Sequence, residues 1–208
     1  MIAIIFLLHM LTYWGIGILL YIFRDKSAGP SLRSVSHVIK TVLLNQSTIP
    51  IMTYFASNYI LLGETNSMRE SINHLVIMLL VEEFGFYYTH RLFHTYFFYK
   101  YHKIHHEFYN PIGIAALYCH LSEFLLTNLL PLGMAPIVSS HLISPIDVNL
   151  LYFWIFCATL NTVLEHSNLA KNPIRRHYYH HVNGKKNYGV LGILDWMHGT
   201  LGLEAFAE

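Results

Sequence analysis

Apolar residues dominate this chain in long runs that are separated by short polar stretches. The first run covers residues 2–23 and contains no Asp, Glu, Lys or Arg. At about 1.5 Å per residue, a helix of this length crosses the roughly 30 Å hydrocarbon core of a bilayer. A cleavable signal peptide is the alternative. The run is too long for one, lacks a basic start and is followed by no small-residue cleavage site, so we predict a membrane helix.

Four further apolar runs follow along the chain. The second covers about 41–62, the third begins at His74, and the last two cover roughly 114–138 and 142–164. Residues 24–40 are predicted to form a polar linker and residues 63–73 a polar turn. Prolines 131, 136 and 145 are expected to mark the turn between the last two runs. The pattern predicts an all-α integral membrane helical bundle of about 4–5 transmembrane helices, with a histidine-rich helical cap.

The basic residues sort onto one side of this map. If the first helix ends in the cytosol, residues 24–40, 90–113 and 165–208 are cytosolic and hold every Lys and Arg of the 13 except Arg69. This is the positive-inside pattern of membrane proteins, and a very apolar soluble protein would not show it. The histidine-rich segments are therefore predicted to face the cytosol. Asn45, in an Asn-Gln-Ser sequon, is predicted to be unmodified because it lies within the bilayer or on the cytosolic side.

The composition narrows the function classes. Only 12% of the residues are charged, against about 25% in soluble domains. The net charge of +1, with no basic tract, argues against nucleic acid as a partner. Cys119 and Cys157 both lie in apolar runs and are interpreted as buried thiols. Histidine is the anomaly, with 15 residues against 12 for Asp and Glu together.

Eight histidines form three closely spaced boxes. Residues three and four apart share one face of an α-helix, so each box is expected to point its rings in one direction. The boxes consist of His90 and His94; His102, His105 and His106; and His177, His180 and His181.

Three explanations compete for these boxes. Tolerance of histidine at a membrane interface explains isolated residues such as His9 and His74, but not two copies of His-x-x-His-His. A pH switch would place up to eight like charges together. Neutral imidazole is the commonest metal ligand, and eight ligands exceed the four of a tetrahedral zinc site. Two metal ions with open positions fit this count best.

The boxes also resemble those of a known family. HRLFH, HKIHHEF and HYYHH, in this order, resemble the histidine boxes of the fatty acid hydroxylase and sterol desaturase superfamily. NPIGIAALYCHLSE and NYGVLGILDWMHGT resemble the family segments after the second and third boxes, most closely in carbon-4 methylsterol oxidases and fatty acid hydroxylase domain-containing proteins. The likeness covers about 75–202. We therefore expect N-terminal membrane helices and a linker over 1–74, and a di-metal domain over 75–208.

The resemblance implies a membrane-bound, non-heme di-iron monooxygenase of the endoplasmic reticulum. Such an enzyme uses O2 to oxidise a C–H bond of a sterol or fatty acyl lipid, as in carbon-4 sterol demethylation. Its electrons come from NAD(P)H through a reductase and a cytochrome-b5-type donor. The cofactor that the resemblance implies is therefore two Fe ions. Zinc binds the same ligands and can occupy the site in the isolated protein.

The resemblance also implies a ligand set. It adds His166, in LEHSNL, to the eight box histidines, and His120, in LYCHLSE, is the competing candidate that we consider weaker. Glu83 lies seven residues before His90 and Glu165 adjoins His166, so both are candidates to orient ligand rings. The chain departs from the family pattern at Thr162, where the hydroxylase branch has a histidine, and at Leu194-Asp195, where many members have Trp-Asp.

Two rival functions remain on the sequence alone. One is a histidine-rich membrane protein that binds or transports a metal, and the other is an inactive lipid-binding relative. A transporter would place its ligands deep in the helices along a path, whereas these boxes lie at the ends of apolar runs. The aromatic stretches beside the boxes are interpreted as an interfacial belt rather than a substrate gate.

Overall fold

The computed structural model describes residues 1–24, 32–108, 110–167 and 176–202, and they are mostly helical. The longer helices are α1 (Ile2–Phe23), α2 (Leu32–Gln46), α3 (Ile49–Ser57), α4 (Met68–Phe93), α7 (Leu130–Leu142), α8 (Val148–Glu165) and α9 (Arg176–Asn183). Short helices are α5 (Tyr99–His102), α6 (Leu121–Glu123) and α10 (Ile193–Met197), with a π-helical turn over Phe124–Leu129. Strands β1 (Leu62–Gly63) and β2 (Ile146–Asp147) pair in parallel. The predicted all-α membrane class is confirmed.

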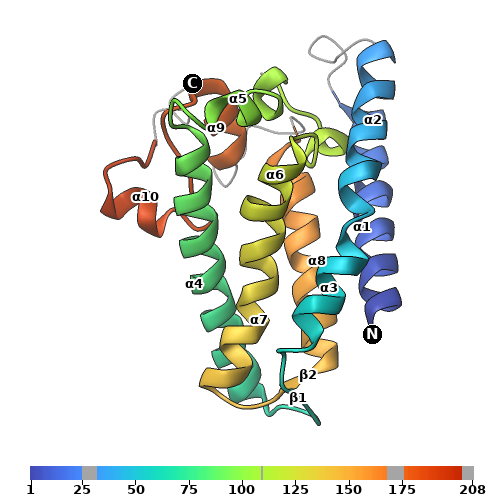
Figure 1. Ribbon diagram of the computed structural model, residues 1–208, viewed down its shortest axis with the longest axis vertical. Helices are drawn as coiled ribbons and strands as arrows, with labels where there is room; N and C mark the ends of the chain where they lie inside the picture. The colour runs from blue at the N-terminus through green and yellow to red at the C-terminus, as the bar shows by residue number, and fades with distance from the viewer. Residues whose placement is uncertain (25–31, 109, 168–175, 203–208) are drawn as a thin grey trace.

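The long helices stand side by side and alternate in direction (Figure 1). Helices α1, α4 and α8 run one way, whereas α2–α3 and α6–α7 return. The two short strands close one end of the bundle, and α5, α6 and α9 lie at the other end. Helix α4 packs against α7, and α1 packs against α8. This alternation is the one that the five apolar runs predict, and it brings the histidine boxes to a single end.

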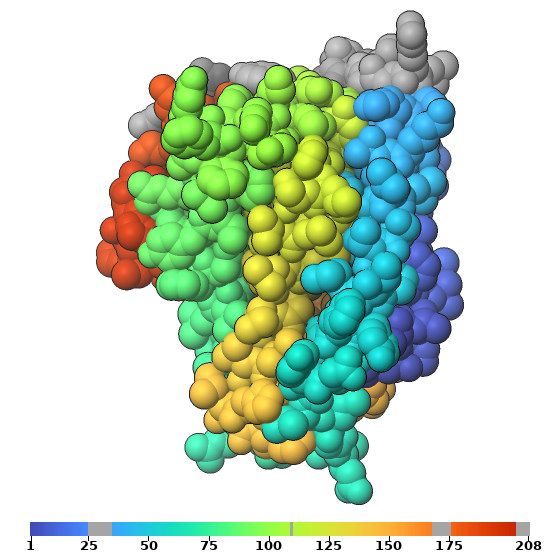
Figure 2. All heavy atoms as spheres, in the orientation of Figure 1, coloured from blue at the N-terminus to red at the C-terminus, as the bar shows by residue number. Residues whose placement is uncertain are grey.

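Three helical segments have the length and composition to cross a membrane: Ile2–Phe23, Leu121–Leu142 and Val148–Glu165. Figure 2 shows α4, α6–α7 and α2–α3 as three neighbouring ridges on one face. Large apolar side chains such as Leu11 on α1, Phe55 on α3 and Phe84 on α4 are exposed, as expected where a helix contacts lipid. The third run forms the longer helix α4, which crosses the expected boundary between residues 74 and 75.

The second apolar run differs from the prediction, because it does not form one helix. It is divided between α2 and α3, and Pro50 lies in the first turn of α3. Proline has no N–H to donate to the preceding turn, so it is tolerated at a helix start but interrupts a continuous helix. The expected linker over 24–40 is also wrong in part, because α2 begins at Leu32.

The prolines expected at the last turn are distributed differently. Only Pro145 lies in the turn, whereas Pro131 lies in the first turn of α7 and Pro136 inside that helix. Pro131 is the second residue of α7, a position where the missing N–H of proline is tolerated. A Cβ on Gly85 would lie 2.8 Å from Cβ of Pro131, so glycine permits the close packing of α4 on α7.

Buried polar contacts hold the segment after the second box. The Tyr13 hydroxyl donates to the Ile114 carbonyl (3.0 Å) and accepts from the Leu117 amide (3.1 Å). Asn45 Nδ2 donates to the carbonyls of Leu117 and Cys119, both at 3.0 Å. The Asn45 side chain is only 1% exposed, so its burial supports the prediction that it is unmodified. Both cysteines are free thiols.

Candidate metal centre

The box histidines and His166 gather into two adjoining clusters. In each cluster, nitrogen atoms that can bind a metal lie within 4.8 Å of one another. The ring centroids of His106 and His181, which belong to different clusters, are 4.7 Å apart. The five-histidine cluster consists of His90, His94, His102, His106 and His180, and the four-histidine cluster consists of His105, His166, His177 and His181.

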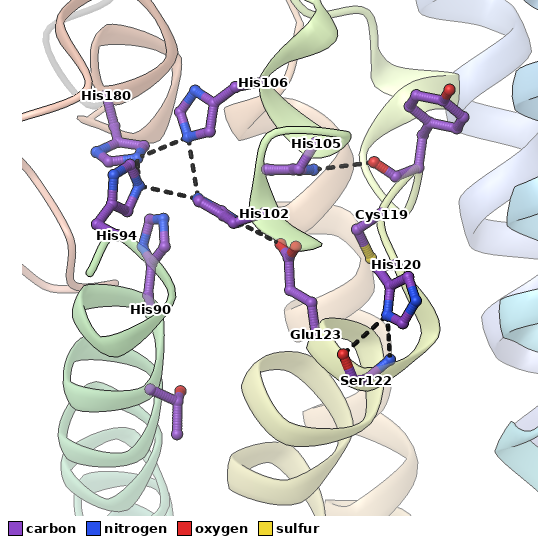
Figure 3. A network of polar contacts seen from close by, with 12 residues as sticks. His90, His94, His102, His105, His106, Cys119, His120, Ser122, Glu123 and His180 are labelled. Carbon is purple, nitrogen blue, oxygen red and sulfur yellow. Dashed lines mark hydrogen bonds and ion pairs between the residues drawn. The ribbon is translucent and has the colours of Figure 1, made fainter. Parts of the chain in front are cut away.

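Helix ends and one short turn place these rings. His90 lies in the last turn of α4 and His94 caps that helix, while His166 caps α8. His102 ends α5, and His105 and His106 lie on a 3-10 turn, His105–Glu107. Figure 3 shows four of these rings, from separate elements, pointing toward one another: His94, His102, His106 and His180.

The expectation that each box points one way holds for the first box, whose two histidines share a cluster, but is wrong for the second and third. In the second box, His102 and His106 join the five-histidine cluster and His105 joins the other. In the third box, His180 joins the five-histidine cluster, whereas His177 and His181 join the other. The reason is angular: adjacent residues are about 100° apart around an α-helix, so His180 and His181 project from α9 toward different clusters.

The Nε2 atoms of the five-histidine cluster converge. His94 Nε2 lies 2.9 Å from both His102 Nε2 and His180 Nε2. His106 Nε2 lies 3.0 Å from His102 Nε2 and 3.2 Å from His180 Nε2, which completes a ring of four atoms (Figure 3). Nε2 of His90 is buried and has no hydrogen-bond partner.

In three of these five rings the opposite nitrogen, Nδ1, contacts an acceptor. Nδ1 of His90 donates to the Tyr188 carbonyl (2.8 Å), and Nδ1 of His180 donates to the Lys186 carbonyl (2.7 Å). Nδ1 of His102 lies 2.8 Å from Glu123 Oε1. A proton held on Nδ1 leaves the Nε2 lone pair free, which is the tautomer that a metal requires.

The Nε2 atoms of the four-histidine cluster converge in the same way, and two of its four rings have an acceptor at Nδ1, whereas Nδ1 of His177 and of His181 is buried without a hydrogen-bond partner. Nε2 of His105 lies 3.2 Å from His166 Nε2, 3.3 Å from His177 Nε2 and 3.1 Å from His181 Nε2. Nδ1 of His105 donates to the Tyr118 carbonyl (3.2 Å), and Nδ1 of His166 donates to the Thr162 carbonyl (2.8 Å). Thr162 thus supports a ring through its backbone, at the position where the hydroxylase branch has a histidine.

These donor sets fit metal ions. Burial, the main cause, lowers the pKa of His94 to about 3 and the pKa values of His106 and His166 to about 4, so the rings are neutral at pH 7. Neutral rings with inward lone pairs about 3 Å apart repel one another unless a cation lies between them. Imidazole suits iron and zinc alike. Among the described residues, neither cluster contains a carboxylate, unlike carboxylate-rich di-iron bundles.

His120, the weaker ligand candidate, lies outside both clusters. It is the N-cap of α6, and its Nδ1 accepts from the Ser122 amide at 3.2 Å and lies 2.8 Å from Ser122 Oγ (Figure 3). A capping ring uses this lone pair to satisfy the start of a helix. The neighbouring Glu123 contacts His102, with its Oε1 2.8 Å from His102 Nδ1.

Glu83 and Glu165 act through the backbone. The buried Glu83 carboxylate accepts from the amides of Leu191 (2.6 Å) and Leu194 (2.9 Å). Glu165 accepts from the His177 amide (3.0 Å) in the first turn of α9. Glu83, a candidate to orient a ligand ring, thus holds the loop whose Tyr188 carbonyl contacts His90.

The loop before α10 supplies two of the ring acceptors. Asp195 accepts from the amides of Tyr188 (2.8 Å) and Gly189 (2.7 Å) and from the Thr200 hydroxyl (2.7 Å). A Cβ on Gly189 would lie 2.8 Å from both carboxylate oxygens of Glu83, so a larger residue here would displace that carboxylate. Glu83 and Asp195 together hold the carbonyl of Tyr188 against His90. The sequence showed this motif without revealing its role.

A cavity of about 870 Å³ extends from the clusters along the bundle. His90, His105 and His166 line one part of it, and Met1, Ile5 and Leu132 line another. Its walls are mostly apolar, and its volume is in the range of sites for small-molecule ligands. The clusters are therefore accessible to an apolar molecule within the bundle.

The fold and the site define a helical membrane protein whose two histidine clusters fit a di-metal site. The chain belongs to the fatty acid hydroxylase family, whose model matches residues 75–200.

The chain is 38% identical over 173 residues to human fatty acid hydroxylase domain-containing protein 2, covering 78% of this chain and 50% of that protein. It is 32% identical over 151 residues to methylsterol monooxygenase 1-2 of Arabidopsis thaliana, covering 64% of this chain and 48% of the relative. It is 28% identical over 202 residues to the very-long-chain aldehyde decarbonylase GL1-11 of Oryza sativa subsp. japonica, covering 86% and 73%. The chain thus spans about half the length of several curated relatives. No solved structure matches it.

Proposed function

We propose that this chain is a membrane-bound, non-heme di-iron oxidoreductase that uses O2 to hydroxylate a C–H bond of a sterol or fatty acyl lipid. One observation carries the proposal: two all-imidazole clusters adjoin each other and open onto an apolar cavity of about 870 Å³. The names of the relatives, which include a methylsterol monooxygenase, agree with lipid oxidation as the reaction class.

The nine clustered histidines would hold two iron ions. When bound, the ions supply O2 activation and the oxidation of an unactivated C–H bond. The chain itself supplies position: the carbonyls of Tyr188, Lys186 and Tyr118 hold protons on Nδ1, so each Nε2 faces inward. The cavity walls bind the apolar part of the lipid and exclude water from the reacting carbon.

We place the protein in the endoplasmic reticulum membrane with the clusters on the cytosolic side. The exposed basic residues Lys100, Lys103 and Lys185 belong to the cluster end of the bundle, as the positive-inside pattern requires of a cytosolic face. These positive charges also favour the binding of an acidic electron-donor protein at this end. A cytochrome-b5-type protein and its reductase would deliver electrons from NAD(P)H at this end.

The metal-transport alternative is less well supported. A transport path needs ligands at successive depths of the bundle, whereas within the described ranges both candidate clusters lie at one end. An inactive lipid-binding relative would retain the cavity but would not need the paired nitrogens of both clusters. Iron content and turnover separate these functions from the enzyme.

The test uses the full chain purified in mild detergent. We expect about two iron ions per chain by elemental analysis. With iron, a chemical reductant, ¹⁸O2 and a membrane lipid extract, we expect one ¹⁸O atom in a lipid hydroxyl, and none with zinc in place of iron. Iron-loaded protein that forms no labelled lipid with any sterol or acyl lipid contradicts the proposal.

A further inference from the structure

The cavity contains polar groups well away from the histidine clusters. Glu82 on α4 and Thr159 on α8 both line it. Glu82 lies eight residues before His90, and Thr159 lies seven residues before His166. At 1.5 Å per residue, both lie roughly 10–12 Å from the cluster end of their helices. The two residues therefore lie on different helices that line the same cavity, at a similar distance from the cluster end.

Glu82 offers an unused hydrogen-bonding atom. Its Oε2 is buried and has no partner. An unpaired buried carboxyl oxygen is costly, and nearly all such atoms in native proteins have a partner. The oxygen accepts a hydrogen bond in either protonation state of the carboxyl group. The position therefore calls for a donor within the cavity.

Thr159 ends a directional chain of hydrogen bonds. The Trp14 indole donates to Gln46 Oε1 (2.9 Å), which fixes the orientation of the amide, and Gln46 Nε2 donates to His9 Nε2 (3.0 Å). The His9 proton must then reside on Nδ1, which donates to Thr159 Oγ1 (3.0 Å). This leaves the Thr159 hydroxyl with a proton to donate.

We propose that Glu82 and Thr159 form a subsite for the hydroxyl group of the lipid substrate. A hydroxyl accepts from Thr159 and donates to Glu82 at one oxygen atom, whereas a carbonyl or an ether only accepts. This inference rests on the proposed function and deepens it. It places the oxidised carbon roughly 10–12 Å from the hydroxyl. The 4-methyl group of a sterol is next to the hydroxyl-bearing carbon and is therefore too close to the subsite to reach the metals. A sterol bound in this way would be oxidised at a more distant carbon.

The test compares lipids that differ only in the hydroxyl group. The probes are cholesterol and its deoxy analogue, and a long-chain primary alcohol and the alkane of equal length. Each is measured by competition with a radiolabelled lipid on the metal-loaded protein. We expect the hydroxylated member of at least one pair to bind about tenfold more tightly, as one well-made hydrogen bond allows. The pair that responds distinguishes a sterol from a fatty alcohol.

Four variants test whether Glu82 and Thr159 cause the preference for the hydroxylated lipid. Thr159→Val and Glu82→Leu are expected to abolish the tenfold preference, whereas Glu82→Gln, which retains an acceptor oxygen, keeps most of it. Thr89→Val is the matched control, because that hydroxyl donates within its own helix to the Gly85 carbonyl (2.7 Å). Metal content shows that each variant is folded.

Equal affinities within both pairs in the unsubstituted protein overturn the subsite. A preference that survives both Thr159→Val and Glu82→Leu overturns it as well. Either result leaves the proposed oxidation intact, provided that the protein holds iron and forms labelled lipid. Loss of iron or of turnover in the unsubstituted protein counts against the proposed function instead.

Discussion

Several inward-facing imidazoles are held by the group that their second nitrogen contacts. Carbonyl oxygens of Tyr188, Lys186 and Tyr118 take this role for His90, His180 and His105. A carbonyl needs no particular side chain, so nothing in the residue type announces the role. Glu83 and Asp195 matter because they fix such a loop.

Substituting the two competing histidines tests the ligand assignment. We expect His166→Gln to weaken metal binding or activity by about 10–100-fold or more, because it removes a cluster nitrogen. His120→Gln removes only a helix cap and is expected to cost less. Metal content per chain and turnover are measured for both. Full metal content in His166→Gln would show that His166 is no ligand.

Glu83→Gln tests support through the loop. A glutamine side chain has one acceptor oxygen where the carboxylate accepts two backbone amides, and its own N–H would face a donor. We expect metal affinity to fall about 10–100-fold, as for other groups that orient ligands. The exposed Glu64→Gln serves as the control, and affinity is measured by chelator competition. An unchanged affinity in Glu83→Gln would show that the loop does not position the ligands.

At the scale of elements, each His-x-x-His-His box contributes to both clusters. Residues four apart go to one cluster and the intervening residue goes to the other. The second box gives its outer pair to the five-histidine cluster, whereas the third box gives its outer pair to the four-histidine cluster. The elements that carry these two boxes therefore link the two clusters. A change in α9 therefore acts on both.

Double variants distinguish boxes from clusters as the binding units. His102→Gln with His180→Gln alters two boxes but one cluster, and we expect about one ion per chain to remain. His177→Gln with His180→Gln alters one box but both clusters, and we expect less than one. Elemental analysis of both variants measures the difference. If the variant with His102→Gln and His180→Gln held less metal than the variant with His177→Gln and His180→Gln, the boxes rather than the clusters would be the binding units.

Across the whole molecule, alternation of the helices places loops at two opposite ends. Single cysteines at Thr65 and Lys103 lie at these ends, and both positions are exposed. In sealed endoplasmic reticulum vesicles, we expect an impermeant thiol reagent to label Lys103→Cys from the cytosolic side and to leave Thr65→Cys unlabelled. The unsubstituted protein gives the background from Cys119 and Cys157. Labelling of both sites from one side rules out the topology. Lys171, another cytosolic position in the predicted map, lies outside the described residues.

The buried histidines also predict a pH dependence of folding. The pKa values of His94, His106 and His166 are lowered to between about 3 and 4, whereas in the unfolded chain they return to near the ordinary 6.5. Below 6.5 the unfolded state binds more protons, so the stability present above pH 6.5 is lost as pH falls toward 4. The slope is at most about 1.4 kcal/mol per pH unit for each group.

Thermal unfolding of the metal-free protein in detergent measures this effect. We expect a lower midpoint at pH 5 than at pH 7.5, and a smaller difference when metal occupies the clusters, because bound rings cannot take up protons. Equal midpoints for the metal-free protein would show that the rings titrate normally in the folded state.

The sequence by itself determined the helical membrane class, the alternating map and the histidines that gather at one end. These follow from hydropathy, charge sorting and residue spacing, which are local properties. It did not determine the division of the second run at Pro50 or the positions of Pro131 and Pro136 inside a helix, because neighbouring helices decide whether a proline breaks or bends a segment. Tertiary structure alone decided that the boxes divide between clusters, that His120 caps a helix and that Glu82 and Thr159 line one cavity. Each of these depends on the angle and position at which separate helices meet.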